Sequence, residues 1–118
     1  MTKNVFAAFA VVRVGELLWA TTRDGADSGK IALPGGKLDN GETPEEAVLR
    51  ECREEGLALQ GKPSLLREQV LDGYRIRWYS FPYATPLSDY KEKKRGIKAL
   101  LVKPSELSPG FGNEFLTQ

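Results

Sequence analysis

Three glutamates, Glu51, Glu54 and Glu55, have the spacing in this sequence that most directly suggests chemistry. In a helix, the spacing i, i+3, i+4 places the three carboxylates on one face, within about 100° of one another. Like charges on adjacent turns repel each other, so the pattern is unfavourable unless a cation neutralises it. Mg²⁺ prefers carboxylate and water oxygens, often together with a substrate phosphate. The spacing therefore predicts either a magnesium site or a solvated acidic face that Arg50 and Arg53 neutralise.

The composition limits which other chemistry is available. The chain has 17 Lys+Arg and 16 Asp+Glu, a formal net charge of +1, no histidine and one cysteine. Without histidine there is no imidazole acid–base catalysis, no Ser-His-Asp triad and no His-ligated zinc. One cysteine excludes an internal disulfide and a multi-cysteine metal site. Catalysis must therefore use carboxylates, Lys, Arg, Tyr or a metal held by oxygen, and the near-neutral charge argues against a nucleic-acid or membrane partner.

The length of 118 residues indicates one domain, which we expect to span residues 1–118. The apolar run at 5–12 follows Lys3, as in a signal peptide, but Arg13 ends it and no cleavage region follows. The run is also far shorter than the ~20 residues that span a bilayer. We therefore expect it to form a buried first strand in a cytoplasmic protein.

Turn-forming residues divide the first forty positions into strands and loops. Two adjacent strands are expected at 5–14 and 16–23, and a loop rich in Gly, Asp and Ser at 24–29. The Leu-Pro-Gly-Gly run and the Asn-Gly pair after it predict a loop over 33–41.

The clearest helix signal begins at Thr43. Thr43 as N-cap, Pro44 at the first helical position and Glu46 three residues after the cap form a capping box. Gly56 is the expected stop. Cys52 lies on the apolar side of this acidic helix and is expected to be a core residue rather than a nucleophile. The three clustered glutamates thus belong to one amphipathic helix.

The second half of the chain predicts a hairpin and one further strand. An Asp-Gly pair separates apolar runs at 68–71 and 74–81, which is a strong hairpin signal because both turn residues need positive φ. A charged loop at 88–96 leads to a strand at 97–102. The Pro- and Gly-rich tail leaves room only for a short last helix.

The segment from Gly36 to Gly56 resembles the signature of the Nudix hydrolases, and in particular of their MutT-like members. That signature is a Gly, five residues, a Glu, seven residues and then Arg-Glu-apolar-x-Glu-Glu. With Cys52 in the apolar slot, the defining positions match in order at Gly36, Glu42, Arg50, Glu51, Glu54 and Glu55. Gly56 follows Glu55 directly, whereas the family has one residue between them, so we expect the helix to end one residue early.

The resemblance implies an α/β fold of the Nudix type, an α/β/α sandwich with a mixed β-sheet and the signature loop and helix. It also implies a pyrophosphohydrolase that uses Mg²⁺, or Mn²⁺ in its place. The substrate would be a nucleoside triphosphate or a related nucleoside diphosphate derivative. The implied metal ligands are the Gly35 carbonyl and the carboxylates of Glu51, Glu54 and Glu55. Glu42 would support the loop.

Catalytic roles are implied for Glu51 and Glu54, and for Arg50, which would orient Glu51 by a charge-assisted hydrogen bond. The family often places a further catalytic Glu in a loop before the last strand. Glu92 stands in such a loop, and Glu68 is the other candidate; the sequence alone leaves both open.

Four further residues are candidates for substrate contact. Arg23, at the end of the second strand, suits a bidentate phosphate contact, and Lys37 is a second phosphate candidate; the alternative for each is a solvent-facing side chain. Asn113 either reads a purine edge through its paired donor and acceptor or caps a short helix. Tyr79 and its neighbour Trp78 point to opposite faces of their strand, and either ring could border the nucleotide pocket.

Two other functions fit the same residues. One is a non-catalytic nucleotide-binding or regulatory module, and the other is an RNA-processing hydrolase that uses the basic patch at 91–98. That patch could equally be a solvated loop. The short Pro- and Gly-rich tail is expected to leave one face of the sheet thinly covered. This predicts a homodimer, because exposed apolar patches tend to mark interfaces.

Overall fold

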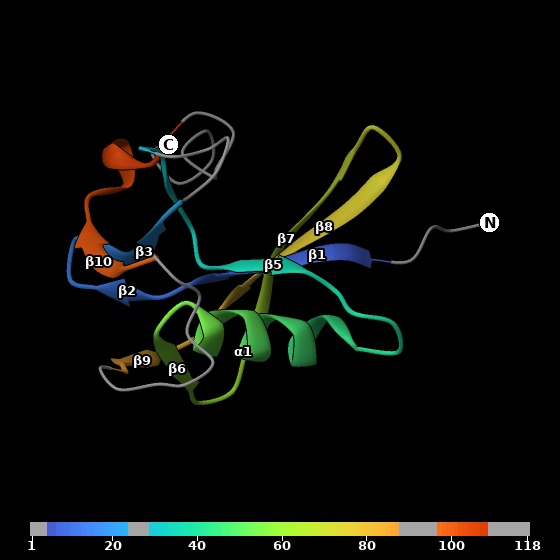
Figure 1. Cartoon of the computed structure of the whole chain (residues 1–118), viewed down its shortest axis with the longest axis horizontal. Coiled ribbons are helices and arrows are strands. Elements are labelled where there is room, and N and C mark those ends of the chain that lie inside the picture. Colours follow the sequence, from blue (N-terminus) through green and yellow to red (C-terminus); the bar gives the residue numbers. More distant parts are fainter. Residues whose placement is uncertain (1–4, 24–28, 88–96, 109–118) are drawn as a thin grey trace.

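A mixed four-stranded sheet with one α-helix packed on it organises the chain as an α/β sandwich (Figure 1). The computed structural model describes residues 5–23, 29–87 and 97–108. Its helical elements are α1 (Pro44–Glu54) and a short 3-10 helix (Pro104–Glu106). Its strands are β1 (Val5–Val11), β2 (Arg13–Val14), β3 (Leu17–Thr22), β4 (Ile31–Ala32), β5 (Gly35–Lys37), β6 (Leu57–Gln60), β7 (Ser64–Leu71), β8 (Tyr74–Ser80), β9 (Tyr83–Pro86) and β10 (Ala99–Val102). This architecture confirms the predicted α/β fold with a mixed sheet.

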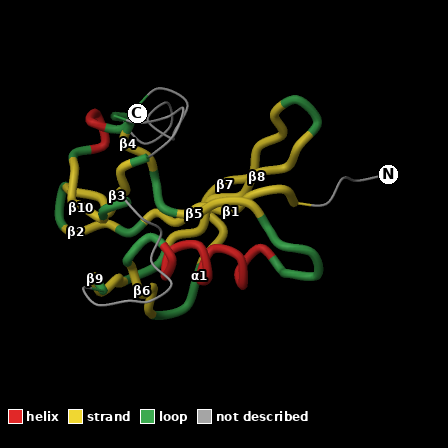
Figure 2. The backbone as a smooth tube through the Cα atoms, in the orientation of Figure 1, coloured by secondary structure: helices red, strands yellow, loops and turns green. Residues whose placement is uncertain are grey.

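The apolar strand β1 lies inside the central sheet, whose strand order is β5-β1-β8-β7. It pairs antiparallel with β5 and parallel with β8, and β8 pairs antiparallel with β7. Ala8 lies opposite Gly36 and Phe9 opposite Gly35. This pairing fixes the start of the signature loop at the edge of the sheet, just before the chain enters α1 (Figure 2).

Two smaller sheets complete the described part of the fold. One has the strand order β10-β3-β2, with β4 also paired to β3. The other consists of β6, which follows α1 directly, and β9. None of the helices in the described residues is long and apolar enough to cross a membrane.

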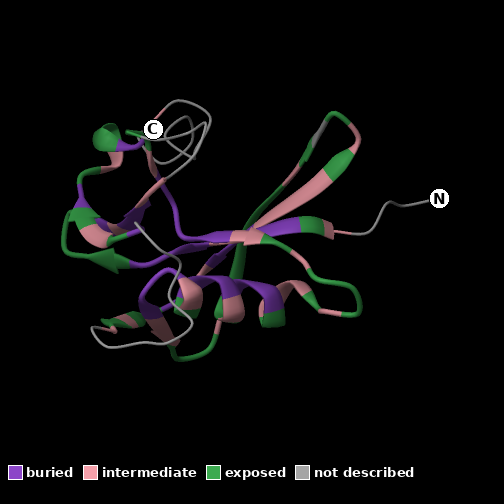
Figure 3. Ribbon diagram, in the orientation of Figure 1, coloured by how far each residue is buried: buried purple, intermediate pink, exposed green. Residues whose placement is uncertain are grey.

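The hydrophobic core occupies both faces of the central sheet (Figure 3). The cluster that includes side chains of α1 contains Ala8, Ala10, Val12, Val48, Cys52, Leu57, Tyr79 and Phe81. The other cluster joins the central sheet to β3 and β10, and it contains Val11, Leu18, Ala20, Leu33, Trp78, Val102 and Leu107. Trp78 and Tyr79 belong to different clusters because successive side chains of a strand alternate between its faces. Cys52 is fully buried, which confirms it as a core residue.

Helix α1 begins as the sequence predicts. The Thr43 hydroxyl accepts a hydrogen bond from the Glu46 amide, and the Glu46 carboxylate accepts one from the Thr43 amide. Pro44 occupies the first turn. These contacts satisfy two backbone N–H groups that have no partner within the helix.

The predicted hairpin is also confirmed. Asp72 and Gly73 have φ angles of 50° and 81°, so both turn residues adopt the left-handed conformation that a two-residue turn of this kind requires. The strand before the turn starts earlier than predicted, at Ser64 instead of residue 68.

The loop predicted over 33–41 is wrong in its first half, because Gly35–Lys37 forms β5. Two glycines and a lysine have low strand propensity, and their extended conformation depends on pairing with β1, a segment distant in the sequence. Short strands β4, β6 and β9 were likewise not predicted. The loop at 88–96 and the tail beyond residue 108, with Glu92 and Asn113, lie outside the described residues.

Candidate active site

The three glutamates of the pattern lie at the C-terminal half and end of α1. Glu51 and Glu55 are buried, with 7% and 1% of their surface exposed, and the Glu54 side chain is 22% exposed. Glu51 lies against β5: a Cβ placed on Gly36 would come within 2.7 Å of its carboxylate. The absence of a side chain at Gly36 therefore makes room for the Glu51 carboxylate beside the sheet edge.

Glu55 follows the last helical residue and turns toward the sheet. The Gly35 amide donates a hydrogen bond to Glu55 Oε1 at 2.9 Å. Glu55 is the C-cap of α1, and Gly56 after it has a φ of 94°, a left-handed conformation that ends the helix. The predicted stop at Gly56 is thus observed, and the Glu55 carboxylate is bound at β5.

Arg50 connects the loop to the carboxylates of the helix. Its Nε and Nη2 atoms donate to the two oxygens of Glu42 at 2.7 and 3.0 Å, a bidentate pair. Its Nη1 atom donates to Glu51 at 3.1 Å and to Glu54 at 2.7 Å. The predicted contact between Arg50 and Glu51 is therefore present, and Arg50 also holds Glu54.

The pKa values of this network follow from the same contacts. The hydrogen bonds from Arg50 hold the pKa of Glu42 below its usual range, and the Asp39 amide acts in the same direction by donating at 2.7 Å. The pKa of Arg50 is raised, chiefly by Glu42 and then by Glu54 and Glu51. Glu42 thus closes the signature loop onto Arg50 as a charged group.

The donor set suits a hard cation, because it consists of carboxylate and backbone oxygens. Among the described residues, however, no three acidic or cysteine side chains are grouped as a metal ion requires. Arg50 holds Glu51 and Glu54, while the Gly35 amide holds Glu55. A cation that bound these carboxylates would compete with Arg50 for oxygens of Glu51 and Glu54.

Among the described candidates for substrate contact, Lys37 borders this network through its backbone. Arg23 directly follows β3 and is half-buried, and its amide donates to the Lys30 carbonyl. Lys37 ends β5; its Nζ atom lies 5.3 Å from the centre of the Phe6 ring, and its carbonyl accepts from Arg50. The phosphate contacts of Arg23 and Lys37 stay predictions.

The Tyr79 side chain is buried in the core and not exposed at the edge of a pocket. It is 4% exposed and packs in the cluster beside α1, and Arg77 Nη1 donates to its hydroxyl at 3.3 Å. Burial raises the pKa of Tyr79, and its hydrogen bond with Glu45 acts in the same direction. Trp78 is also buried, so both rings are core residues in this structure. A substrate contact by Tyr79 stays a prediction.

Glu68, one of the two candidates for a further catalytic carboxylate, is engaged elsewhere. It accepts from Arg75 Nε at 2.6 Å and from Arg77 Nε at 3.0 Å, and these contacts lower its pKa. Because Glu92 lies outside the described residues, the choice between the two stays open, but Glu68 has a structural partner in each arginine.

Sequence reasoning missed two contributions to this region. Asp39 lies 3.3 Å from Arg50 Nε, so a fourth carboxylate surrounds the same guanidinium. Its position three residues before Glu42, in the same turn, is the only sequence signal for this contact. The pairing of Glu68 with both arginines could have been inferred from the hairpin register, which places Glu68 opposite Arg77.

Comparison with known proteins bears on the family and the fold of the chain. The model of the NUDIX domain family matches residues 2–109. A 37-residue segment is 54% identical to the 8-oxo-dGTP diphosphatase of Escherichia coli strain K12; the match covers 29% of this chain and only 29% of that protein. The chain thus spans well under two thirds of this relative.

Solved structures show the same fold. A putative Nudix hydrolase family member from Chromobacterium violaceum has a TM-score of 0.70 and 22% identity, over 99% of this chain and 77% of that one. A MutT NUDIX hydrolase from Burkholderia pseudomallei has a TM-score of 0.68 and 21% identity, over 92% of this chain and 90% of that one. The chain belongs to the Nudix hydrolase family. Within this family, the chain is MutT-like.

Proposed function

We propose that this protein is a Mg²⁺-dependent pyrophosphohydrolase that cleaves a diphosphate linkage in a nucleoside triphosphate or a related nucleoside diphosphate derivative. The observation that carries the proposal is the position of three carboxylates at the C-terminal end of α1. Glu51 and Glu55 lie against the Gly35–Lys37 edge strand, and Arg50 binds both Glu51 and Glu54. Hydrolases of this family generally use a divalent metal. A diphosphate repels an incoming water through its dense negative charge, and a bound Mg²⁺ would neutralise that charge and lower the pKa of the water.

The residues of the chain would divide the remaining tasks. Glu55, held by the Gly35 amide, keeps the end of α1 against the sheet. Glu51 and Glu54 present carboxylates that could accept a proton from the attacking water. Arg50 fixes the direction of both carboxylates, and Glu42 anchors Arg50 in turn. This chain of charge-assisted hydrogen bonds orients the reactive groups before substrate binds.

The choice of a nucleotide rests on the relative from Escherichia coli. That relative is named 8-oxo-dGTP diphosphatase, so its substrate is a nucleoside triphosphate. Its 54% identity to this chain extends over 37 residues. A segment of that size can share its phosphate chemistry without sharing base specificity. We therefore leave the base open and extend only the diphosphate chemistry.

The test is a panel of nucleoside triphosphates and nucleoside diphosphate derivatives, incubated with Mg²⁺, with Mn²⁺ or with excess EDTA. Release of pyrophosphate, or of a nucleoside monophosphate from the derivative, identifies the broken bond. We expect turnover with either metal and none with EDTA. Full activity in EDTA would refute the metal requirement.

Two isosteric variants make this test specific. Glu54→Gln should lower kcat at least about 100-fold, because it removes a charged oxygen from the site and leaves the shape unchanged. Glu16→Gln, the same change at an exposed turn far from α1 along the chain, should retain wild-type kcat. Binding of a nucleotide without turnover of any panel member would instead favour a non-catalytic module.

A further inference from the structure

The Arg50 guanidinium is divided between two groups of acceptors. A guanidinium carries five N–H donors, and all five are used here. Nε and Nη2 donate to both oxygens of Glu42, at 2.7 and 3.0 Å, and Nη2 also donates to the Lys37 carbonyl at 3.1 Å. Nη1 donates to the helix acids Glu51 and Glu54. Arg50 thus makes three hydrogen bonds to the segment before α1, its loop side, and two to α1, its helix side.

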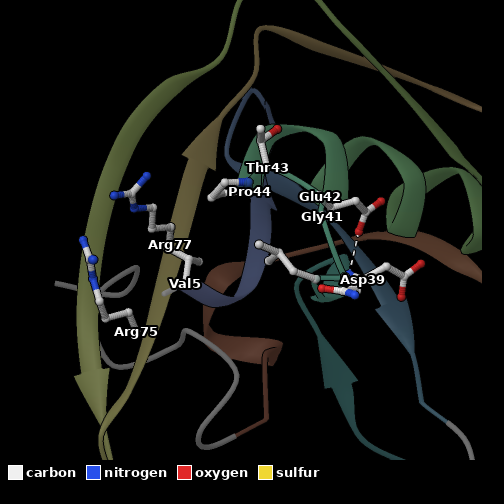
Figure 4. Close-up of a pocket in the computed structure, with 10 residues that line it drawn as sticks. Val5, Asp39, Gly41, Glu42, Thr43, Pro44, Arg75 and Arg77 are labelled. Atoms are coloured by element: carbon white, nitrogen blue, oxygen red, sulfur yellow. Dashed lines mark hydrogen bonds between the residues drawn. The ribbon is translucent and has the colours of Figure 1, made fainter. Parts of the chain in front are cut away.

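Asp39 adds a carboxylate on the loop side. Its Oδ2 atom lies 3.3 Å from Arg50 Nε, but the single hydrogen of Nε is donated to Glu42 at 2.7 Å. Asp39 therefore contributes charge to this contact rather than a further hydrogen bond. Its backbone amide donates to Glu42 Oε1 at 2.7 Å; Figure 4 shows this bond, with both carboxylates directed away from Arg75 and Arg77. The turn thus presents two acids to one guanidinium.

A cation bound by Glu51 and Glu54 would change the balance between the two sides. It would replace Nη1 at the carboxylate oxygens or share these carboxylates with it, and in both cases it would repel the guanidinium. The helix side would then hold Arg50 less strongly, and the acids of the loop side would balance more of its charge. An acid on the loop side therefore stabilises Arg50 more when the cation is bound than when it is absent.

We propose that Asp39 is a positioning residue for the divalent cation: it holds Arg50 toward the loop and thereby raises the affinity of Glu51 and Glu54 for Mg²⁺. This inference rests on the proposed Mg²⁺-dependent hydrolysis, but it concerns binding of the cation and not turnover. The Asp39 side chain is 70% exposed, and ion pairs of exposed groups are weak. The expected effect on affinity is therefore modest, about threefold.

The test measures cation binding to the full chain without nucleotide. Mn²⁺ serves as the probe, because EPR detects the free ion, and Mg²⁺ is measured by its displacement of bound Mn²⁺. Asp39→Asn removes the charge but keeps the size of the side chain and the backbone amide that binds Glu42. We expect this variant to bind both ions about threefold more weakly than wild type. Circular dichroism checks the fold of each variant.

Moving the charge by one residue separates the contact with Arg50 from a general effect of negative charge. Asn40 follows Asp39 in the same exposed loop, so Asp39→Asn combined with Asn40→Asp keeps the net charge of the wild type. We expect this double variant to bind the cation as weakly as Asp39→Asn. Asp39→Glu keeps a carboxylate at the original position and should bind within twofold of wild type. Glu16→Gln, the distant control, should bind as wild type does.

The Nε–H resonance of Arg50 reports on the guanidinium directly. Mg²⁺ is diamagnetic, so NMR can follow this resonance during a titration. We expect saturation with Mg²⁺ to shift it in the wild type, because the cation changes the acceptors of Nη1 while Nε stays with the loop. The resonance should not shift when Mg²⁺ is added in the presence of excess EDTA.

Three outcomes would overturn the proposal and leave the proposed hydrolysis intact. One is equal affinity of Asp39→Asn and wild type for the cation. Another is recovery of affinity in the double variant, which would indicate a general charge effect. The third is an Arg50 resonance that does not shift on saturation with Mg²⁺. Absence of saturable Mn²⁺ binding to the wild type would contradict both this proposal and the metal requirement of the hydrolysis.

Discussion

The guanidinium of Arg50 is surrounded by four carboxylates, those of Asp39, Glu42, Glu51 and Glu54, all within 3.3 Å. Four negative charges thus face one positive charge in a partly buried region. Bidentate and shared hydrogen bonds make such a group rigid, but the excess negative charge stays unfavourable. The same side chain that orders the acids therefore leaves them with residual affinity for a further cation.

The first prediction concerns Glu42 and pH. Its pKa is lowered by Arg50 in the folded state, so its stabilising effect is fully present above the unfolded pKa, about 4.3, and is lost as pH falls through the folded pKa. Glu42→Gln should therefore cost about 1–2 kcal/mol at pH 7. The difference from wild type should shrink below about pH 4.

Urea unfolding of both proteins between pH 3.5 and pH 8 measures this difference. Glu16→Gln is the control, since Glu16 is exposed and lies far from Arg50 along the chain. A gap between wild type and Glu42→Gln that widened on acidification would contradict the assignment of the lowered pKa to the bond with Arg50.

The second prediction separates two adjacent glycines. The three atoms nearest to a Cβ at Gly36 would all belong to the Glu51 carboxyl group, the closest at 2.7 Å, whereas a Cβ at Gly35 would meet the Cα of Phe9 at 2.6 Å. Gly35 also has a φ of 140°, which favours glycine. Gly36→Ala should thus displace the Glu51 side chain and reduce kcat at least tenfold in a folded protein. Gly35→Ala should destabilise the fold by several kcal/mol.

Thermal unfolding and steady-state kinetics on both variants test this contrast. Similar loss of stability in the two would mean that the Glu51 side chain cannot move aside at Gly36. Full activity of Gly36→Ala would show that the observed position of Glu51 against β5 is not needed for turnover.

At the scale of elements, the sequence predicted those helices and turns that depend on residues close together in the chain. Helix α1 and the β7–β8 turn were predictable, because a capping box and an Asp-Gly pair act through residues a few positions apart. Strand β5 was not, because two glycines and a lysine become extended only by pairing with β1. The contact of Arg50 with Glu51 followed from the signature, whereas its hydrogen bonds to Glu42 and Glu54 did not. Asp39 joined them through a turn that the sequence did not define.

The third prediction concerns the start of α1. Thr43→Ala removes the hydroxyl that accepts from the Glu46 amide, and should lower the free energy of unfolding by about 1 kcal/mol. Thr43→Ser keeps the acceptor and should restore most of that loss. Urea unfolding at pH 7 measures both. Equal losses in Ala and Ser would attribute the effect to the Thr methyl group rather than to the cap.

At the scale of the whole molecule, apolar side chains are exposed on the β7–β8 hairpin. Leu65, Leu66, Val70 and Tyr74 are between 48% and 62% exposed. β7 is also an edge strand of the central sheet, with its outer backbone groups unpaired by another strand in the described residues. Exposed edges of this kind tend to associate.

The fourth prediction is therefore that the protein forms a homodimer in solution, as the sequence also suggests. Light scattering over a range of concentrations should show a mass that rises toward twice 13.1 kDa. Val70→Lys should shift the equilibrium to the monomer, whereas Val14→Lys, at an exposed site on β2, should not. A monomer mass independent of concentration would rule out this association.

The parallel pairing of β1 with β8 also has a consequence for how the chain folds. Val5 pairs with Arg75 and Phe9 with Trp78, partners that lie about 70 residues apart in the sequence. A β-hairpin such as β7–β8 forms within microseconds, whereas closing so long a loop costs chain entropy before any ladder hydrogen bond forms. During synthesis, β1 leaves the ribosome well before its parallel neighbour exists. We expect docking of β1 onto the finished hairpin to limit the folding rate, so that the strand at the centre of the sheet is placed last.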